Sequence, residues 1–462
     1  MGHSASPGTA VQSAIGLFAA WLESQRAYAG IPGVSAGIVH DQELVWAGGF
    51  GLASLECGEP ATPATLYRIA SITKVFTATA LLQLRDAGRL RLDDPVVAHL
   101  PWFDIQQPHA DAPAIALRHL LTHAAGLPRE AGTPYWADGN FPSADELRGS
   151  LGRQRTVLPP ETRWKYSNLG LALAGEIVAA VSGQPYAAYV RERILEPLGM
   201  RDTLVEAPVP SHPGLATGYT RRLPGVERRE PVPHTDTRGL APAANMTTSV
   251  RDLARFAMLQ FRGGPAGGSQ ILRGSTLREM HRIHWLEPDW QAGWGLGFHV
   301  WRDANQTLVG HGGRLRGYRT QLLFSPDDRV AAIVMTNADD GTPLPWATRA
   351  FHWVAPALAA TIAPPPAPGP DPAWSRYVGR YRSPWNDTEV LLHGDGLVLV
   401  DPSQPDPLPS LSRLVPVAEH AFRIETRDGY GSAGELVVFE LTGDRVTRVR
   451  IGDNYTYPVA SW

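Results

Sequence analysis

Cysteine and lysine are both scarce in this chain of 462 residues, which has one cysteine, Cys57, and two lysines, Lys74 and Lys165. A single thiol excludes an internal disulfide framework and any zinc or iron–sulfur site made of several thiolates. Because only two of the 42 basic residues are lysine, arginine fills almost every cationic position. The formal net charge of −3 excludes the strongly basic surface on which nucleic-acid binding depends.

Long hydrophobic runs are missing as well. No stretch reaches the roughly eighteen apolar residues that a membrane span requires. The first basic residue is Arg26, so the start of the chain lacks the positively charged region of a signal peptide. We therefore expect a soluble, cytoplasmic protein without membrane or nucleic-acid partners, although a leader removed ahead of this sequence would not be visible.

Proline is concentrated in one place, where it marks a domain boundary. Six of the ten residues of the segment 363–372 are proline. Such a run favours an extended conformation and continues neither a helix nor a central strand. We expect a semi-rigid linker here, between a domain at 1–362 and a smaller domain at 373–462.

The first domain shows both hydrophobic periodicities. Strands are predicted at 34–39, 43–47, 306–310, 320–324 and 330–335, and helices at 10–22, from Ser71 to Gly88, at 170–181 and at 344–360. Strands at both ends with helices between them favour an α+β fold, in which helices back an antiparallel sheet. The two ends of the domain should meet in that sheet.

The second domain has a different pattern of short alternating runs broken by turn residues. These runs predict strands at 389–393, 397–400, 421–425, 435–440 and 446–451. The sequence therefore predicts a small antiparallel sheet or barrel after the linker.

The segment Ser71-Ile72-Thr73-Lys74 places a hydroxyl and an amine three residues apart at the start of a predicted helix. Residues i and i+3 share a helix face, so Lys74 can reach the Ser71 oxygen. The helix N-terminus also offers free N–H groups to an oxyanion formed beside Ser71. The alternative is a capping serine followed by a surface lysine. The scarcity of lysine supports the first interpretation, since a buried lysine can lose its proton whereas an arginine cannot.

A second candidate segment is Tyr166-Ser167-Asn168, which precedes a predicted helix. A loop of this kind can present a phenol and a carboxamide side by side. The phenol can relay protons, and the amide can bind a carbonyl and tether the lysine. The alternative is a core tyrosine followed by an asparagine that caps the helix.

A third candidate segment is His311-Gly312-Gly313, at the end of the strand predicted over 306–310. Glycines at this place let a ligand approach the strand backbone closely. An imidazole beside them can donate a proton near neutral pH. The alternative is a glycine-rich hairpin turn.

In this order and at these separations, the three segments resemble the serine β-lactamase and penicillin-recognising superfamily, which includes class C β-lactamases, DD-peptidases, D-aminopeptidases and related esterases. Three further stretches fit the same pattern: LLTHAAGL at 120–127, EPLGM at 196–200 and GWGLG at 293–297. The resemblance spans about 31–360 and implies an antiparallel sheet flanked by helices, plus an all-helical subdomain. The segment 377–381 resembles the opening strand of the lipocalin-like β-barrel domains attached to many of these hydrolases.

The resemblance implies a serine acyl-transfer site. Ser71 would be the nucleophile, and Lys74 and Tyr166 would share the roles of general base and general acid. Which of the two takes the serine proton stays open, because both have ordinary pKa values that are too high for a base at neutral pH. Asn168 would bind the substrate carbonyl, and the backbone N–H groups of Ser71 and Arg314 would form the oxyanion hole.

One position departs from the β-lactamase pattern. His311 stands where β-lactamases of this group carry a lysine that pairs with the carboxylate of the β-lactam. A histidine there is similar to the D-aminopeptidases and some DD-peptidases, so at most weak β-lactamase activity is expected. Arg314 and Arg316 follow closely and can either supply a replacement cation or lie solvated on the surface.

The sequence therefore predicts a serine hydrolase of the esterase or D-residue peptidase and amidase type, acting on a small-molecule or short-peptide substrate through a Ser71 acyl-enzyme. No metal and no organic cofactor are expected. His119 and His123, four residues apart, lack the intervening glutamate of a zinc protease. Two alternatives stay open: a penicillin-binding-type acyltransferase or peptide cyclase, and a slow-deacylating penicillin-binding sensor.

Overall fold

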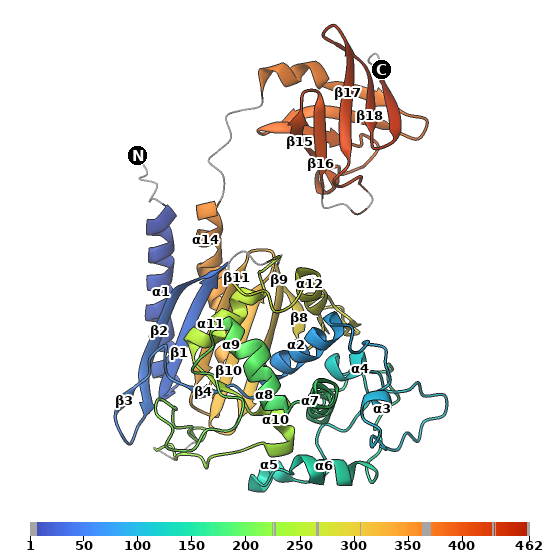
Figure 1. Ribbon diagram of the computed structural model, residues 1–462. Coiled ribbons are helices and arrows are strands. Elements are labelled where there is room, and N and C mark those ends of the chain that lie inside the picture. Colours follow the sequence, from blue (N-terminus) through green and yellow to red (C-terminus); the bar gives the residue numbers. More distant parts are fainter. Residues whose placement is uncertain are drawn as a thin grey trace. The chain divides into compact units, whose positions relative to one another are not determined.

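The computed structural model describes residues 7–459 except 224, 226–227, 265–267, 305, 363–370, 427–428 and 430 (Figure 1). The chain forms two compact units, Met1–Thr361 and Ile362–Trp462. The proline-rich segment predicted to be a linker lies outside the described residues except for its last two positions. No helix in the described part of the chain is both long and apolar enough to cross a membrane.

An antiparallel sheet organises the first unit (Figure 1). Its nine strands lie in the order β3-β2-β1-β11-β10-β9-β8-β7-β6. Their bounds are β1 Gly33–His40, β2 Glu43–Ser54, β3 Glu59–Pro60, β6 Trp285–Leu286, β7 Ala292–Trp294, β8 His299–Asp303, β9 Gln306–Leu315, β10 Tyr318–Ser325 and β11 Val330–Thr336. β1 pairs with β11 over seven residues, from Val34 opposite Thr336 to His40 opposite Val330, so the two ends of the domain meet as predicted.

The central strands are buried on both faces. Along β11, Val330, Ala332 and Val334 belong to one hydrophobic core, and the alternating residues Ala331 and Ile333 belong to another. This alternation follows from the period of two that a strand imposes on its side chains. One core includes side chains of α1 Pro7–Tyr28, α13 Pro343–Trp353 and α14 Ala355–Ile362, and the other includes side chains of α2 Thr73–Asp86, α7 Asn168–Ser182 and α11 Val250–Leu259.

The predicted α+β class, with its helical subdomain, is confirmed. Between the short paired strands β4 Tyr67–Arg68 and β5 Thr247–Thr248, the described chain forms helices and loops only. Besides α2 and α7, these helices are α3 Val96–His99, α4 Leu117–Leu121, α5 Tyr135–Asp138, α6 Ala144–Leu151, α8 Tyr186–Val190, α9 Glu196–Leu198 and α10 Ala241–Ala244. After α11, α12 Gly274–His281 precedes the strands that complete the sheet.

Several element boundaries differ from the prediction. β9 does not end at Gly310 but continues to Leu315, so His311, Gly312 and Gly313 lie inside a strand, not in a hairpin turn. Glycine has low strand propensity, which hides this continuation in the sequence. The single closing helix predicted over 344–360 is two helices, α13 and α14, separated at Val354.

The second unit is a closed antiparallel barrel, as predicted. Its strands are β12 Gly379–Arg382, β13 Asp387–His393, β14 Gly396–Val400, β15 Ser412–Ala418, β16 Ala421–Glu425, β17 Leu436–Thr442, β18 Arg445–Ile451 and β19 Asn454–Pro458. Pairing of β12 with β19 closes the barrel, and aromatic side chains, among them Phe422 and Phe439, fill its interior. The sequence prediction missed β15 and β19, each of which contains a proline, Pro416 and Pro458, a residue that disfavours a strand.

Replacing Gly175 by alanine should lower the stability of the first unit. Gly175 lies inside α7, and a β-carbon there would collide with the Pro242 ring on α10. Overpacking of this kind typically costs about 1–3 kcal/mol. As the control, Gly149→Ala on the exposed side of α6 meets no neighbouring atom and should raise stability by about 0.5–1 kcal/mol through helix propensity. Urea unfolding of both variants measures the difference, and equal effects would contradict the packing argument.

Candidate active site

Ser71 lies in a short 3-10 turn, η1 Ala70–Ile72, that leads directly into α2. Ala70, the residue before it, has a positive φ of 47°, a conformation that costs energy for any residue except glycine. The segment is held on both sides, since the Ile69 N–H donates to the Met246 carbonyl and the Thr320 hydroxyl donates to the Ile69 carbonyl. These contacts fix the position at which the Ser71 hydroxyl is presented.

The amine of Lys74 lies behind Ser71 and is fully buried. Its Nζ is 3.0 Å from the Ser71 Oγ, 2.8 Å from the Asn168 Oδ1 and 2.8 Å from the Ala243 carbonyl oxygen. Burial lowers the pKa of Lys74 well below its ordinary value, because the charged form loses its hydration; the nearby carboxylate of Glu130 opposes this shift, and Arg129 adds to it. The predicted contact between serine and lysine is therefore present, with the amine in a setting that favours its neutral form.

Tyr166 approaches Ser71 from the other side. Its phenol donates a hydrogen bond of 2.9 Å to the Ser71 Oγ. Burial raises the pKa of Tyr166, since the phenolate would be poorly solvated. The Lys74 Nζ lies 5.0 Å and the Arg129 guanidinium 4.8 Å from the centroid of its ring. Tyr166 is thus a neutral phenol in hydrogen-bond contact with the serine.

His123 supports Tyr166, a role that the sequence did not indicate. Its ring centroid is 4.3 Å from that of Tyr166, and its Nδ1 accepts a hydrogen bond from the Ser167 N–H. Burial lowers the pKa of His123 well below its ordinary value, so the ring is neutral. α4 ends at Leu121, before His123, and the Nε2 of His119 contacts Glu161, so these two histidines do not share a helix face. No group of three or more possible metal-ligating side chains occurs among the described residues.

Asn168 links Lys74 to a carboxylate that the sequence prediction missed. While the Asn168 Oδ1 accepts from Lys74, its Nδ2 donates to Glu130 at 2.9 Å and 3.1 Å. Glu130 also accepts a hydrogen bond from the Tyr135 hydroxyl. No motif marks Glu130, which follows the stretch 120–127 in a loop, and only the fold brings it to the site. With both ends of its amide in use, Asn168 holds the lysine.

The glycines of β9 allow this strand to lie against η1. A β-carbon at Gly313 would collide with the Ile69 carbonyl and with the Thr320 hydroxyl. Gly312 is exposed, and Arg314 two residues later is exposed as well. The close approach that Gly313 allows here joins a strand to the turn that carries Ser71, and the predicted approach of a ligand to this strand stays a prediction.

His311 differs from its predicted role as a proton donor near neutral pH. Burial lowers the pKa of His311 to about 3, so the imidazole is neutral at physiological pH. Its Nδ1–H donates to the Gly312 carbonyl at 2.7 Å, which leaves the Nε2 as the unprotonated nitrogen. His311 is thus not a cation that could replace the β-lactamase lysine.

A cavity of about 990 Å³ opens in front of Ser71. Seven of the eight residues predicted for the site line it, namely Ser71, Tyr166, Asn168, His311, Gly312, Gly313 and Arg314. The eighth, Lys74, does not line the cavity but contacts two residues that do, Ser71 and Asn168. The segments 71–74, 166–168 and 311–314, far apart in the sequence, therefore meet at one cavity that is large enough for a small molecule or a short peptide.

Comparison with known proteins places this geometry in a family. The Beta-lactamase family model matches residues 18–352. The Beta-lactamase-like protein 2 of Dictyostelium discoideum is 33% identical over 303 residues, which are 64% of this chain and 54% of that protein. The chain thus spans about half of the length of this relative.

Solved structures show the same fold. The octameric penicillin-binding protein homologue from Pyrococcus abyssi is 24% identical with a TM-score of 0.63, and the match covers 96% of this chain and 99% of that one. The D-amino acid amidase from Ochrobactrum anthropi is 27% identical with a TM-score of 0.59, over 77% of this chain and 99% of that one. The matches also include an esterase from Burkholderia gladioli, a D-stereospecific amidohydrolase from Streptomyces and a hydrolase with promiscuous acyltransferase activity. All three are hydrolases. Because the family model covers most of its length, the chain belongs to the beta-lactamase family of hydrolases.

Proposed function

We propose that the protein cleaves an ester or amide bond through a covalent acyl-enzyme on Ser71. The observation that carries this proposal is the pair of hydrogen-bond contacts at the Ser71 oxygen, one with the Lys74 amine at 3.0 Å and one with the Tyr166 phenol at 2.9 Å. A hydroxyl between two proton-transfer groups, at the floor of a cavity, is the arrangement of an activated nucleophile.

Lys74 acts as the general base in this proposal. A neutral amine has two N–H groups and one lone pair. The carbonyl oxygens of Asn168 and Ala243 can only accept, so they take the two N–H groups. The lone pair then faces Ser71, whose hydroxyl proton moves to the Lys74 Nζ as its oxygen attacks the substrate carbonyl. Burial favours the neutral amine before this step.

Tyr166 acts as the general acid. Its raised pKa keeps the phenol protonated, so it can give its proton to the departing alcohol or amine when the tetrahedral intermediate collapses. The proton held by Lys74 restores the phenol, and a water molecule then attacks the acyl-enzyme with the proton transfers reversed. In this proposal Lys74 is therefore the general base and Tyr166 the general acid, an assignment that the sequence left open.

The backbone N–H groups of Ser71 and Arg314 form the oxyanion hole in this proposal. Two features support it: η1 lies directly at the start of α2, and the glycine contact brings β9 against η1. Donors fixed in this way stabilise the charge that develops on the carbonyl oxygen, and each contributes about a hundred- to thousandfold in rate.

The substrate proposed is the ester or amide of a small molecule or short peptide, as for an esterase or a D-residue amidase or peptidase. The names of an esterase from Burkholderia gladioli and of the Ochrobactrum amidase agree with this class. Neutral His311 supplies no positive charge for a β-lactam carboxylate, so β-lactamase activity should be weak. Acyl transfer to an amine and a long-lived acyl-enzyme are the alternatives, and product analysis separates them from hydrolysis.

Replacing Ser71 by alanine should abolish turnover and remove the covalent intermediate. The experiment mixes the protein with a 4-nitrophenyl ester, a penicillin or a D-amino-acid amide and measures intact mass over time. A transient acyl adduct with free acid as product identifies a hydrolase. A persistent adduct identifies a sensor, and a transferred or cyclised product identifies an acyltransferase. Turnover that survives in Ser71→Ala would refute the assignment.

Replacing Lys74 by arginine should lower kcat/KM by about a hundred- to ten-thousandfold, the usual contribution of a general base, because a guanidinium cannot accept the proton. The matched control is Lys165→Arg, which changes the only other lysine and lies one residue before Tyr166. Lys165 is partly exposed, and this control should keep nearly full activity. Similar losses in both variants would contradict the role of Lys74.

The pH dependence of kcat/KM should show a rise followed by a broad plateau. Activity needs the unprotonated amine, so it increases as the pH passes the pKa of Lys74, which burial holds well below the ordinary lysine value. The plateau should extend into the alkaline range because burial raises the pKa of Tyr166, and Tyr166→Phe should remove the alkaline fall along with most of the activity. A profile that falls as pH rises through neutrality would contradict a neutral lysine base.

A further inference from the structure

β9 and β10 form a hairpin, and one end of it lies at the cavity in front of Ser71. Arg316 and Gly317 make up the two-residue turn between the strands. Gly317 has a positive φ of 80°, a conformation that favours glycine. All the residues 311–316 line the cavity, so the position of this turn shapes the site.

The register of the hairpin sets the direction of the Arg314 backbone. In an antiparallel pair, opposite residues alternate between those that exchange two backbone hydrogen bonds and those that exchange none. Leu315 and Tyr318 flank the two-residue turn, and a pair in this place is a bonded one. Arg314 and Arg319 are the next pair, so the Arg314 N–H faces away from β10. The Arg319 carbonyl agrees with this direction, since it accepts a hydrogen bond from the Thr336 hydroxyl on β11, at the other side of β10.

This end of β9 has a neighbouring strand on one side only. β8 pairs with β9 from Gln306 to Gly310, so among the described strands the residues 311–315 pair with β10 alone. Three of the four residues 310–313 are glycine, which restricts the backbone least. A donor for an oxyanion must stay at a fixed place, so the Arg314 N–H needs support from outside its own strand.

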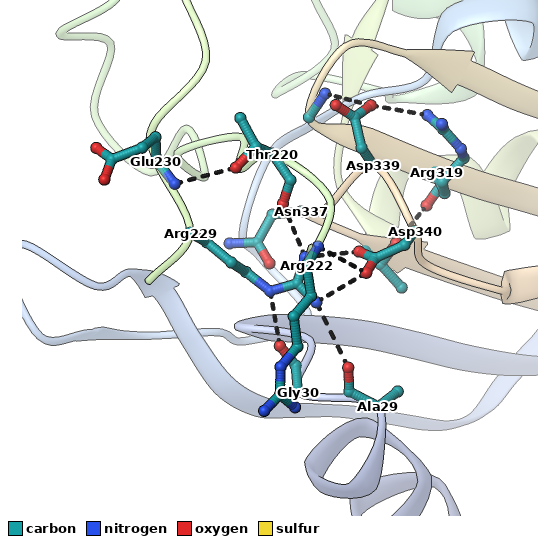
Figure 2. Close-up of polar contacts among 12 residues, drawn as sticks. Ala29, Gly30, Thr220, Arg222, Arg229, Glu230, Arg319, Asn337, Asp339 and Asp340 are labelled. Atoms are coloured by element: carbon teal, nitrogen blue, oxygen red, sulfur yellow. Dashed lines mark hydrogen bonds and ion pairs between the residues drawn. The ribbon is translucent and has the colours of Figure 1, made fainter. Parts of the chain in front are cut away.

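The carboxylate of Asp339 supplies this support (Figure 2). Its Oδ1 accepts a hydrogen bond of 3.0 Å from the Gly317 N–H in the turn and lies 3.3 Å from the Arg319 Nη1. The same Nη1 is 3.1 Å from the Leu315 carbonyl oxygen on β9 and 2.9 Å from the Tyr318 carbonyl oxygen on β10. One carboxylate therefore holds the turn directly and, through Arg319, holds both strands that enter it.

Asp339 is itself fixed by its surroundings (Figure 2). Its N–H donates to the Tyr219 carbonyl at 3.0 Å. Asp340, the next residue, has its carboxylate 2.6 Å and 3.1 Å from two nitrogens of Arg229, and it accepts a further hydrogen bond from the Arg222 N–H. Arg229 is 7% exposed and is not among the residues that line the cavity. A buried ion pair thus anchors Asp339 from behind the cavity wall.

We infer that Asp339 is a positioning residue for the oxyanion hole: it holds the β9–β10 turn, and with it the Arg314 N–H, in place, and the Arg229–Asp340 ion pair acts through it. The inference rests on the proposed function, in which this N–H stabilises the charge on the substrate carbonyl oxygen. Because Asp339 acts through the backbone of another residue, its effect should appear in the stabilisation of the oxyanion and not in the binding of the substrate.

The test compares a 4-nitrophenyl ester with its thionoester, in which sulfur replaces the carbonyl oxygen. Donors placed for an oxygen stabilise the larger and weakly accepting sulfur less, so the wild-type protein should prefer the ester. Asp339→Ala should lower kcat/KM for the ester about tenfold, mainly through kcat, and should lower the ratio of ester to thionoester severalfold. Asp339→Asn keeps an oxygen that can accept from the Gly317 N–H, so it should retain part of both.

Two further variants separate positioning from a direct contact with the substrate. Arg229→Gln changes a residue outside the cavity lining and should lower the same ratio, by less than Asp339→Ala. The control, Asp327→Ala, removes an exposed carboxylate from the turn between β10 and β11 and should leave the ratio unchanged. Thermal unfolding of each variant checks that the first unit is folded, since a loss of folded protein lowers kcat/KM for both substrates equally.

The outcomes separate the positioning role from the proposed function. If the ester acylates Ser71 but Asp339→Ala keeps the wild-type ratio, the positioning role is wrong and the proposed function stands. An equal fall of the ratio in Asp339→Ala and Asp327→Ala also overturns the positioning role, and an unchanged ratio in Arg229→Gln overturns the part assigned to the ion pair. If the ester does not acylate Ser71, the proposed function fails and the positioning role fails with it.

Discussion

The side chain of Lys74 is a buried amine whose hydrogen-bond partners come from three parts of the fold, and the geometry of the site depends on this arrangement. Ser71 precedes α2, Asn168 begins α7, and Ala243 belongs to α10. An isolated ammonium in such a place would lose several kcal/mol of hydration. Two carbonyl acceptors and a hydroxyl satisfy the neutral amine, and the same contacts aim its lone pair at the nucleophile.

The surrounding packing serves this contact. Gly175 lets α7 lie against α10, so that Asn168 and Ala243 converge on one amine, and Gly313 lets β9 lie against the turn that carries Ser71. Glu130 then holds the far end of the Asn168 amide. A methyl group at either glycine would separate segments that must touch, so close backbone approach is as much a part of the site as its polar side chains.

Sequence analysis predicted the α+β class, the barrel and most of the long elements, because alternation and helical spacing reflect which face of an element is buried. It did not predict the length of β9, whose His311, Gly312 and Gly313 suggest a turn when neighbouring strands are unknown. It also assigned His311 a role as a proton donor, whereas burial keeps this imidazole neutral. Exposure and burial of a single polar residue depend on neighbours that are distant in the sequence.

The sequence by itself determined the chemical groups and their local spacing: a serine and a lysine three residues apart, a tyrosine beside an asparagine, and two glycines after a histidine. Local spacing is set by covalent geometry, which explains why it can be read from the chain. Tertiary structure alone decided how these groups are shifted, since burial lowers the pKa values of Lys74 and His311 and raises that of Tyr166. It also brought Glu130 to Asn168 and joined Arg229 to Asp340 across 111 positions of the chain, because such contacts arise only when the sheet and its helices pack together.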